Sequence, residues 1–345
     1  MLTLGELLGP LREKVDPREL LGAFTPPDRF SHKSFDSYHP RHASQAAAAT
    51  ILRQRAIHLS RPSRNLFAFL KRRTGHGGGV YLDGGFGVGK THLLAAFWNA
   101  APSPKAYLSF DELMYFIGTA GSGQVGEYFE GYKVITVDEW ELDDPGNLKM
   151  ALAFLRTVLA EGVFVAVTSN TLPLELGAGR FSQKDFRLEV EELASSFEVV
   201  RVEGDDYRHR HFAARPTDEY FADAGRFEQK FGEFGTGGLR CNMEELLEVL
   251  GAIHPIRYRE LARRISGLAI EGVTWMEDLS SALRWVHFID SIYDARVPLV
   301  AKGSTALGEI FSEEALQGPY GKKLSRCLSR LEELMAESLG PGVSG

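Results

Sequence analysis

The chain has 345 residues, of which 44% are hydrophobic and 25% are charged, and its formal net charge is −7 at pH 7. This composition is typical of a globular protein with room for a sizeable core and more than one domain. The acidic balance argues against a general affinity for nucleic acid. The two cysteines, Cys241 and Cys327, are too few for a disulfide framework and lack the spacing of a metal site.

The first 60 residues are expected to form an N-terminal segment. Residues 2–15 have the pattern of a short amphipathic helix without the apolar block of a secretory signal, and residues 45–59 that of a second helix. Prolines break the stretch between them. No window approaches the roughly 18 apolar residues of a membrane span, so we expect a cytoplasmic protein with no integral membrane segment.

Short apolar strands alternate with helical stretches in the region 61–210, which we expect to form one domain. The spacing of Leu148, Leu152, Leu155 and Leu159 places them on one face of a helix. Alternation of this kind predicts an α/β fold with a parallel, doubly wound sheet. The expected strands cover residues 80–82, 105–108, 134–137, 163–167 and 199–202.

The composition changes after residue 205. Residues 205–238 are polar and glycine-rich, which favours a connection, and residues 243–336 have mostly helical patterns with one candidate strand at 297–300. We therefore expect residues 211–345 to form a mostly helical C-terminal region.

A glycine-rich motif follows the first expected strand and precedes a helix. It fits G-x-x-x-x-G-K-[ST], in which glycine backbone N–H groups surround a polyphosphate. Lys90 is expected to reach the outer phosphates and Thr91 to bind Mg²⁺, so ATP and Mg²⁺ are the expected cofactors. The alternative is an ordinary glycine-rich loop, and the flanking strand and helix favour the phosphate loop. Its residues are Gly84, Gly85, Phe86, Gly87, Val88, Gly89, Lys90 and Thr91.

Two later strands end in polar residues. Asp138 and Glu139 close the strand at 134–137, where Asp138 could lie beside Mg²⁺ and Glu139 could act as the general base. Asn170 closes the strand at 163–167 and could hold the attacking water or the γ-phosphate. The alternatives are a solvated acid at a strand end and a simple Ser-Asn turn. Tyr38 could line an adenine pocket or simply pack.

These motifs resemble the AAA+ ATPase family of the cell-division protein ZapE and its mitochondrial relatives, over most of residues 40–336. The stretches RWVHFIDSIYD at 284–294, RCLSRL at 326–331 and DYR at 206–208 carry the resemblance beyond the phosphate loop. The resemblance implies a three-layer AAA+ core, hydrolysis of ATP and a ring of identical subunits. It also implies the remodelling of a protein partner in cell division, with FtsZ as the implied partner.

The chain departs from the family at two places. Ser109, Phe110 and Asp111 stand where the family carries His-Phe-His, and the glycine-rich stretch that follows could face partners. The resemblance makes Asn170 the sensor residue and the strand at 163–167 the sensor strand, and the arginine that the family carries after this strand is displaced here. Arg180 is therefore the first candidate for an arginine that acts across a subunit interface, and Arg187 is the second. Each could instead be a solvated arginine at a helix end.

The C-terminal region offers two further arginines. Arg326 or Arg330 could act on the nucleotide of its own subunit, and their spacing of four residues places both on one helix face. They could also belong to an exposed pattern of charges. A DNA-linked AAA+ ATPase, such as a helicase loader or replication initiator, remains the alternative function, since residues 108–114 resemble those proteins a little. A nucleotide-binding scaffold is a third hypothesis, against which the intact Glu139 argues.

Overall fold

The computed structural model describes residues 2–8, 16–61, 78–85, 87–121, 123–142, 145–176, 186–204, 224–305, 307–318 and 320–339. The chain folds as two compact units. The N-terminal unit comprises residues 15–211, and the C-terminal unit comprises residues 212–345 together with residues 1–14. Residues 1–60, which we expected to form a segment of their own, are therefore divided between the two units.

The N-terminal unit contains a five-stranded sheet with the strand order β2-β3-β4-β1-β5. All neighbouring strands are parallel. The five strands match those expected from the sequence, and β4 lies between β1 and β3. The strands are β1 (Gly79–Asp83), β2 (Lys105–Ser109), β3 (Val134–Asp138), β4 (Phe164–Ser169) and β5 (Phe197–Arg201).

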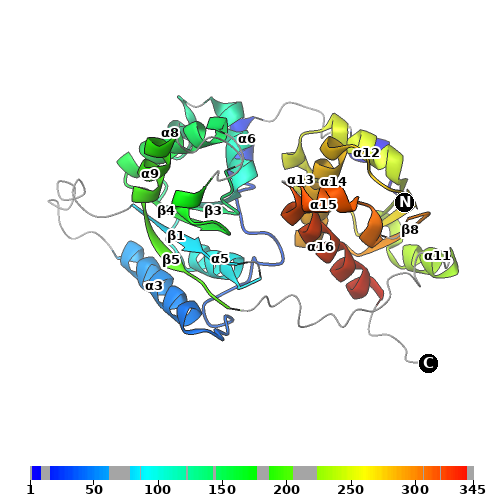
Figure 1. Ribbon diagram of the computed structural model, residues 1–345, viewed down its shortest axis with the longest axis horizontal. Helices are drawn as coiled ribbons and strands as arrows, with labels where there is room; N and C mark the ends of the chain where they lie inside the picture. Colours follow the sequence, from blue (N-terminus) through cyan, green and yellow to red (C-terminus); the bar gives the residue numbers. More distant parts are fainter. Residues whose placement is uncertain are drawn as a thin grey trace. The chain divides into compact units, whose positions relative to one another are not determined.

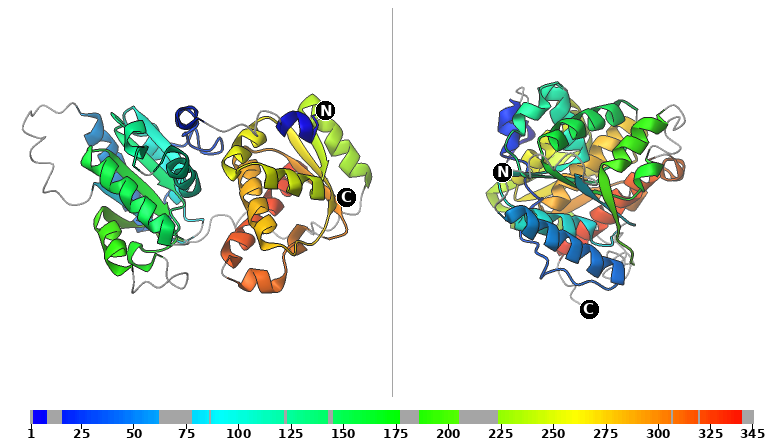
Figure 2. Two further views of the ribbon diagram at one scale, coloured as in Figure 1. Left: turned by 90° about the horizontal axis from the view of Figure 1, so that it is seen from above. Right: turned by 90° about the vertical axis from the view of Figure 1, so that its left-hand side faces the viewer.

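Helices cover both faces of this sheet (Figure 1). Helices α3 and α5 lie on one face, while α6, α8 and α9 lie on the other, as the end-on view in Figure 2 also shows. Every residue of β1 and β3 is buried, as expected of central strands in a parallel sheet that is covered on both sides. The expected three-layer α/β fold is confirmed. Its helices are α2 (Pro17–Leu21), α3 (Ala43–Ser60), α5 (Lys90–Ala100), α6 (Phe110–Ala120), α7 (Val125–Tyr128), α8 (Pro145–Ala160) and α9 (Arg187–Ser195), with a 3-10 turn η2 (Pro173–Glu175).

Local sequence explains where these helices begin and which side they bury. Helix α6 starts with a capping box, in which Ser109 accepts from the Glu112 backbone N–H and Glu112 accepts from that of Ser109. Helix α8 buries Leu148, Leu152 and Leu155, as their spacing predicts.

The C-terminal unit is mostly helical, but its helices pack on a second parallel sheet with the order β6-β7-β8. Only a strand near β8 was expected. The short strands β6 and β7 were missed because Gly238, Asn242, Gly267 and Gly272 interrupt their apolar runs, and such residues are depleted in strands. The strands are β6 (Gly238–Asn242), β7 (Gly267–Val273) and β8 (Leu299–Gly303).

The two faces of the second sheet carry different helices. The main core joins the sheet to α12, α13, α14 and α16. The smaller cluster joins Phe227 and Phe231 of α11 to Ala269 and Val300. Helix α11 lies inside the stretch 205–238 that we expected to be only a connection. The elements are α11 (Ala224–Glu233), η4 (Gly235–Gly237), α12 (Met243–Ala252), η5 (Pro255–Arg257), α13 (Tyr258–Arg263), α14 (Leu279–Asp294), η6 (Leu307–Glu309), α15 (Glu313–Gln317) and α16 (Gly321–Leu339).

The start of the chain joins the C-terminal unit. Leu2 forms a parallel bridge with Leu239, and the Leu2 backbone N–H donates to the Gly238 carbonyl at 3.2 Å. Helix α1 (Leu4–Leu8) packs on α12. Among the described residues, no helix combines the length and the apolar character that crossing a membrane requires.

Candidate active site

The phosphate loop connects β1 to α5, and two of its glycines have no room for a side chain. A Cβ atom on Gly84 would lie 2.1 Å from the Val202 carbonyl oxygen, and one on Gly89 would lie 2.7 Å from the Tyr38 ring. Gly89 also has a φ of 93°, a left-handed conformation that glycine adopts readily. Packing of the loop against the rest of the unit therefore requires glycine at both positions. Phe86 lies outside the described residues.

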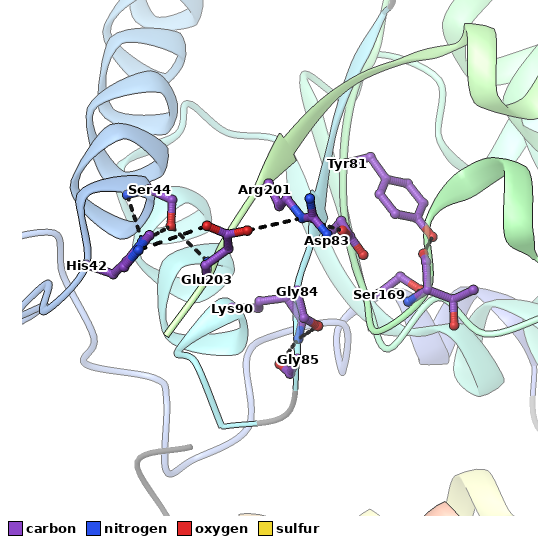
Figure 3. A network of polar contacts seen from close by, with 11 residues as sticks. His42, Ser44, Tyr81, Asp83, Gly84, Gly85, Lys90, Ser169, Arg201 and Glu203 are labelled. Carbon is purple, nitrogen blue, oxygen red and sulfur yellow. Dashed lines mark hydrogen bonds and ion pairs between the residues drawn. The ribbon is translucent and has the colours of Figure 1, made fainter. Parts of the chain in front are cut away.

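Lys90 is the first residue of α5, and its side chain folds back over the loop (Figure 3). The ammonium group donates to the carbonyl oxygens of Gly84 and Gly85, each at 2.6 Å, and to Asn170 Oδ1 at 2.9 Å. These three partners are neutral oxygens, so none of them cancels the charge of the ammonium group. The charge suits an anionic ligand at the N-terminus of α5, where backbone N–H groups also favour anions.

Asp138 ends β3 and is surrounded by hydroxyl groups. The Thr91 hydroxyl lies 3.4 Å from Asp138 Oδ1, the Tyr107 hydroxyl donates to Oδ2 at 2.9 Å, and the Thr168 hydroxyl also donates to Oδ1. Burial raises the pKa of Asp138 and the neighbouring Glu139 raises it further, whereas the three hydroxyl groups lower it. Tyr107 was not singled out from the sequence, and Thr168 was noted only as part of the polar end of its strand, because their contact with Asp138 depends on the order of the strands.

Glu139 has a backbone conformation that is unusual for a residue with a side chain, with a φ of 54°. Hydrogen bonds hold this conformation. The Glu139 backbone N–H lies 3.1 Å from Asp138 Oδ1 and 3.0 Å from the Thr168 hydroxyl, and the Trp140 N–H donates to the Thr168 carbonyl at 2.7 Å. Such strain is concentrated at functional sites, which supports a special role for this residue.

Asn170 follows β4 and lies between the phosphate loop and the segment after β3. Its Oδ1 accepts from Lys90, and its Nδ2 donates to Glu141 Oε1 at 3.1 Å. The structure thus brings Lys90, Thr91, Asp138 and Asn170 together at the carboxyl ends of β1, β3 and β4. Glu141 was missed from the sequence, since no local pattern indicates a contact between two different strand ends.

Charged and polar residues at the end of β5 contact the residue directly before the phosphate loop (Figure 3). Arg201 Nε lies 3.9 Å from Asp83 Oδ2, directly before the loop, and 3.5 Å from Glu203 Oε1. The Glu203 backbone N–H donates to the Ser44 hydroxyl at 2.9 Å, which joins β5 to the start of α3. Tyr38 donates to the Val88 carbonyl at 3.2 Å. Its contact with adenine stays a prediction.

The candidate arginines occupy different surroundings. Arg180 lies outside the described residues. Arg187 begins α9, where its side chain is 74% exposed and lies 3.6 Å from Glu191. Its action across a subunit interface stays a prediction.

Arg326 and Arg330 do share one face of α16, and both contact Asp290 of α14. Arg326 Nη2 lies 2.9 Å from Asp290 Oδ2, and Arg330 pairs with Oδ1. Burial would raise the pKa of Asp290, but the two guanidinium groups outweigh it and lower that pKa to about 2. Because the arginine side chains are only 7% and 9% exposed, the alternative of an exposed charge pattern is wrong. Action on a nucleotide stays a prediction for both.

The oxygen groups around Asp138 fit Mg²⁺ better than a metal held by protein alone. In the part of the chain that the structure describes, no three His, Cys, Asp or Glu side chains gather to hold a metal ion. Mg²⁺ in nucleotide sites takes one or two protein oxygens and completes its shell with phosphates and water. The Thr91 hydroxyl and the Asp138 carboxylate supply such a pair.

Comparison with known proteins identifies the family. The family model for AFG1-like ATPases matches residues 17–234 and 235–340. The chain belongs to the AFG1-like ATPase family. It is therefore an ATPase built on a nucleotide-binding AAA+ core, in agreement with the loop and sheet described above.

One relative of this AFG1-like ATPase is the cell division protein ZapE of Escherichia coli strain K12. The two are 26% identical over 301 residues, which cover 75% of this chain and 78% of the relative. ZapE of strain O157:H7 matches to the same extent. Among solved structures, DnaI is 18% identical with a TM-score of 0.41, covering 53% of this chain and 94% of its own. DnaA from Aquifex aeolicus is 14% identical with a TM-score of 0.37, covering 86% of this chain and 79% of its own.

Proposed function

We propose that the site at the ends of β1, β3 and β4 binds ATP with Mg²⁺ and hydrolyses it. The loop N–H groups and Lys90 bind the phosphates, and Thr91 and Asp138 hold the metal ion. When bound, Mg²⁺ supplies positive charge that offsets the phosphate oxygens. The observation that carries this proposal is the meeting of Lys90, Asn170, Thr91 and Asp138 over short distances at one edge of the sheet.

Glu139 serves in this proposal as the general base. It accepts a proton from water while the water oxygen bonds to the γ-phosphorus and the bond to the β–γ bridging oxygen breaks. Asn170 positions that water from the neighbouring strand end. The constrained backbone of Glu139, held by Asp138 and Thr168, supports this role because it fixes where the carboxylate starts.

We further propose that hydrolysis drives the remodelling of a protein partner in cell division, with FtsZ as the partner. Similarity to the cell division protein ZapE over three quarters of the chain supports this assignment. The net charge of −7 favours a protein partner over nucleic acid.

The active form in this proposal is a ring of identical subunits, in which Arg180 of one subunit completes the site of the next. Two leucines of the N-terminal unit, which lie on either side of Arg180 in the sequence, support a contact surface on this unit. Leu174 in η2 is 61% exposed and Leu188 in α9 is 70% exposed, and these two elements contact each other. Exposed apolar side chains that gather in one patch are typical of an interaction surface.

Phosphate release measured with and without polymerised FtsZ, and with and without DNA, tests the function. We expect FtsZ polymers to stimulate turnover and DNA to leave it unchanged. The Lys90→Ala variant, which is expected not to bind ATP tightly, is the control for contaminating activity. Stimulation by DNA alone would replace this proposal with a DNA-linked ATPase, and absence of hydrolysis under all conditions would favour a scaffold.

A further inference from the structure

The Asn170 carboxamide bridges two side chains of opposite charge. Its Oδ1 accepts from the Lys90 ammonium group at 2.9 Å, and its Nδ2 donates to Glu141 Oε1 at 3.1 Å. An ammonium group can only donate, and an ionised carboxylate can only accept. Only one of the two orientations of the amide satisfies both neighbours. The bridge therefore fixes which end of the amide faces the phosphate loop.

We propose that Glu141 is a positioning residue for ATP hydrolysis that acts through Asn170. By holding Nδ2, Glu141 turns the carboxamide oxygen toward Lys90 and the phosphate site. This inference rests on the nucleotide site proposed above, and it adds a residue to which no role in that site has been given.

The position of Glu141 separates its role from that of the general base. It lies in the segment between β3 and α8, two residues after Glu139, and is partly buried. The Glu141 carboxylate accepts a hydrogen bond from the Asn170 side-chain amide. In this proposal Glu141 therefore sets the orientation of Asn170, whereas the proton of the attacking water goes to Glu139.

The hydrogen bond between Asn170 and Glu141 matters most once ATP is bound. Lys90 is expected to turn from Asn170 toward the phosphates, which removes one of the two partners of the amide. Glu141 then remains to keep Oδ1 directed at the site, where it can accept a hydrogen bond from the attacking water. Without Glu141, the terminal torsion of Asn170 is broad and roughly two-fold, so the N–H₂ group would also face the phosphates.

Three single substitutions test the role. We expect Glu141→Ala to lower kcat about tenfold, the factor for one hydrogen bond of ordinary net strength, with ATP affinity changed by less than about twofold. Glu141→Gln retains a carbonyl oxygen that accepts from Nδ2, so it should keep most of the activity. Glu130→Ala removes an exposed glutamate of the same unit and is the matched control.

A double-substitution cycle with Asn170→Ala makes the test specific. If Glu141 acts through the amide, adding Glu141→Ala to Asn170→Ala should cause no further loss of kcat. Independent losses that multiply would overturn the proposal, as would wild-type turnover in Glu141→Ala.

Two results distinguish the failure of this inference from the failure of the site itself. A Glu141→Gln variant as inactive as Glu139→Gln would show that the charge is required, and so would overturn a positioning role. Wild-type turnover in Glu139→Gln would instead overturn the assignment of the site. Since Glu141→Gln preserves size and hydrogen bonding, it decides the question even if the alanine variant fails to fold.

Discussion

The phosphate loop has an acid, Asp83, directly before it and a cation, Lys90, at its end. The neighbours of each residue determine how much of its charge is offset. The Asp83 side chain is only 7% exposed, and burial raises the pKa of its carboxyl group, while Arg201 lowers it. Lys90, in contrast, contacts neutral oxygens of Gly84, Gly85 and Asn170. Arg201 and Lys90 both lower the pKa of Asp83, so this acid is offset, and we expect the Lys90 ammonium group to be the charge that meets the phosphates.

Removing Lys90 should therefore abolish tight binding of ATP. We expect Lys90→Ala to weaken ATP affinity by about a hundredfold or more, because charge-assisted hydrogen bonds to the phosphates are lost. Titration with a fluorescent ATP analogue measures this change, and circular dichroism checks that the fold is retained. Lys133→Ala, which removes an exposed lysine of the same unit, is the control. Unchanged affinity in Lys90→Ala would contradict the phosphate-loop assignment.

The two acids at the end of β3 should give different phenotypes. Glu139→Gln should still bind ATP but hydrolyse it about 10²-fold or more slowly, the usual scale for loss of a general base. Asp138→Ala should instead weaken the Mg²⁺-dependent part of ATP binding. Turnover and affinity measured on both variants separate these effects. Equal turnover in Glu139→Gln and the unmodified protein would rule out Glu139 as the general base.

At the scale of elements, the sequence predicts strands best where burial on two faces makes an uninterrupted apolar run. The stretches around Val80, Val134 and Val165 are of this kind, and all three were predicted as strands. Strands β6 and β7 have glycines at their bounds or inside them and were missed. Lys90 could be predicted from the glycine-rich motif, and Asp138 and Asn170 could be predicted because each stands at the carboxyl end of an expected strand. Tyr107, Thr168 and Glu141 could not, since their contacts depend on which strands are neighbours.

A network of charges fastens α11 to the second sheet. Arg240 of β6 pairs with Glu271 of β7 at 2.8 Å and with Glu228 of α11 at 2.9 Å, and Lys302 of β8 also pairs with Glu271. The hydrogen bonds from Arg240 and Lys302 outweigh burial and lower the pKa of Glu271 to about 2. The Glu271 carboxylate thus links the three strands, and Arg240 joins them to Glu228 of the helix.

This network predicts a pH dependence of stability. The pKa of Glu271 is depressed in the folded state from an ordinary value of 4.5, so its contribution is present above pH 4.5 and is lost as the pH falls toward 2. We expect Glu271→Gln to lower the free energy of unfolding by about 1 kcal/mol at pH 7, the scale of a partly exposed ion pair, and by almost nothing near pH 2. Urea unfolding at several pH values measures this. Glu248→Gln, at an exposed position on α12, is the control, and an equal loss at every pH would contradict the prediction.

At the scale of the whole molecule, we propose that the nucleotide site of one chain is completed by an arginine of a second chain. The described residues of the site supply Lys90 as a cation, together with the acids Asp138 and Glu139 and the amide of Asn170. An arginine supplied by a second subunit typically adds about 10³ to 10⁵ in rate. In the sequence, Arg180 and Arg187 follow β4 and lie between Leu174 and Leu188, whose side chains are exposed.

We therefore predict that activity depends on assembly and that two inactive variants can complement each other. ATPase activity per chain should rise with protein concentration, because sites shared between subunits are complete only in the ring. Arg180→Ala should lower turnover while ATP affinity stays nearly unchanged. A mixture of Glu139→Gln and Arg180→Ala should recover part of the activity, since some interfaces combine an intact Glu139 from one subunit with an intact Arg180 from the other. Arg187→Ala in the same mixture tests the second candidate, and Lys133→Ala, at an exposed position of the same unit, is the matched control. Constant activity per chain on dilution to a proven monomer, together with an inactive mixture, would mean that each chain contains its whole site and that Arg180 is a surface arginine.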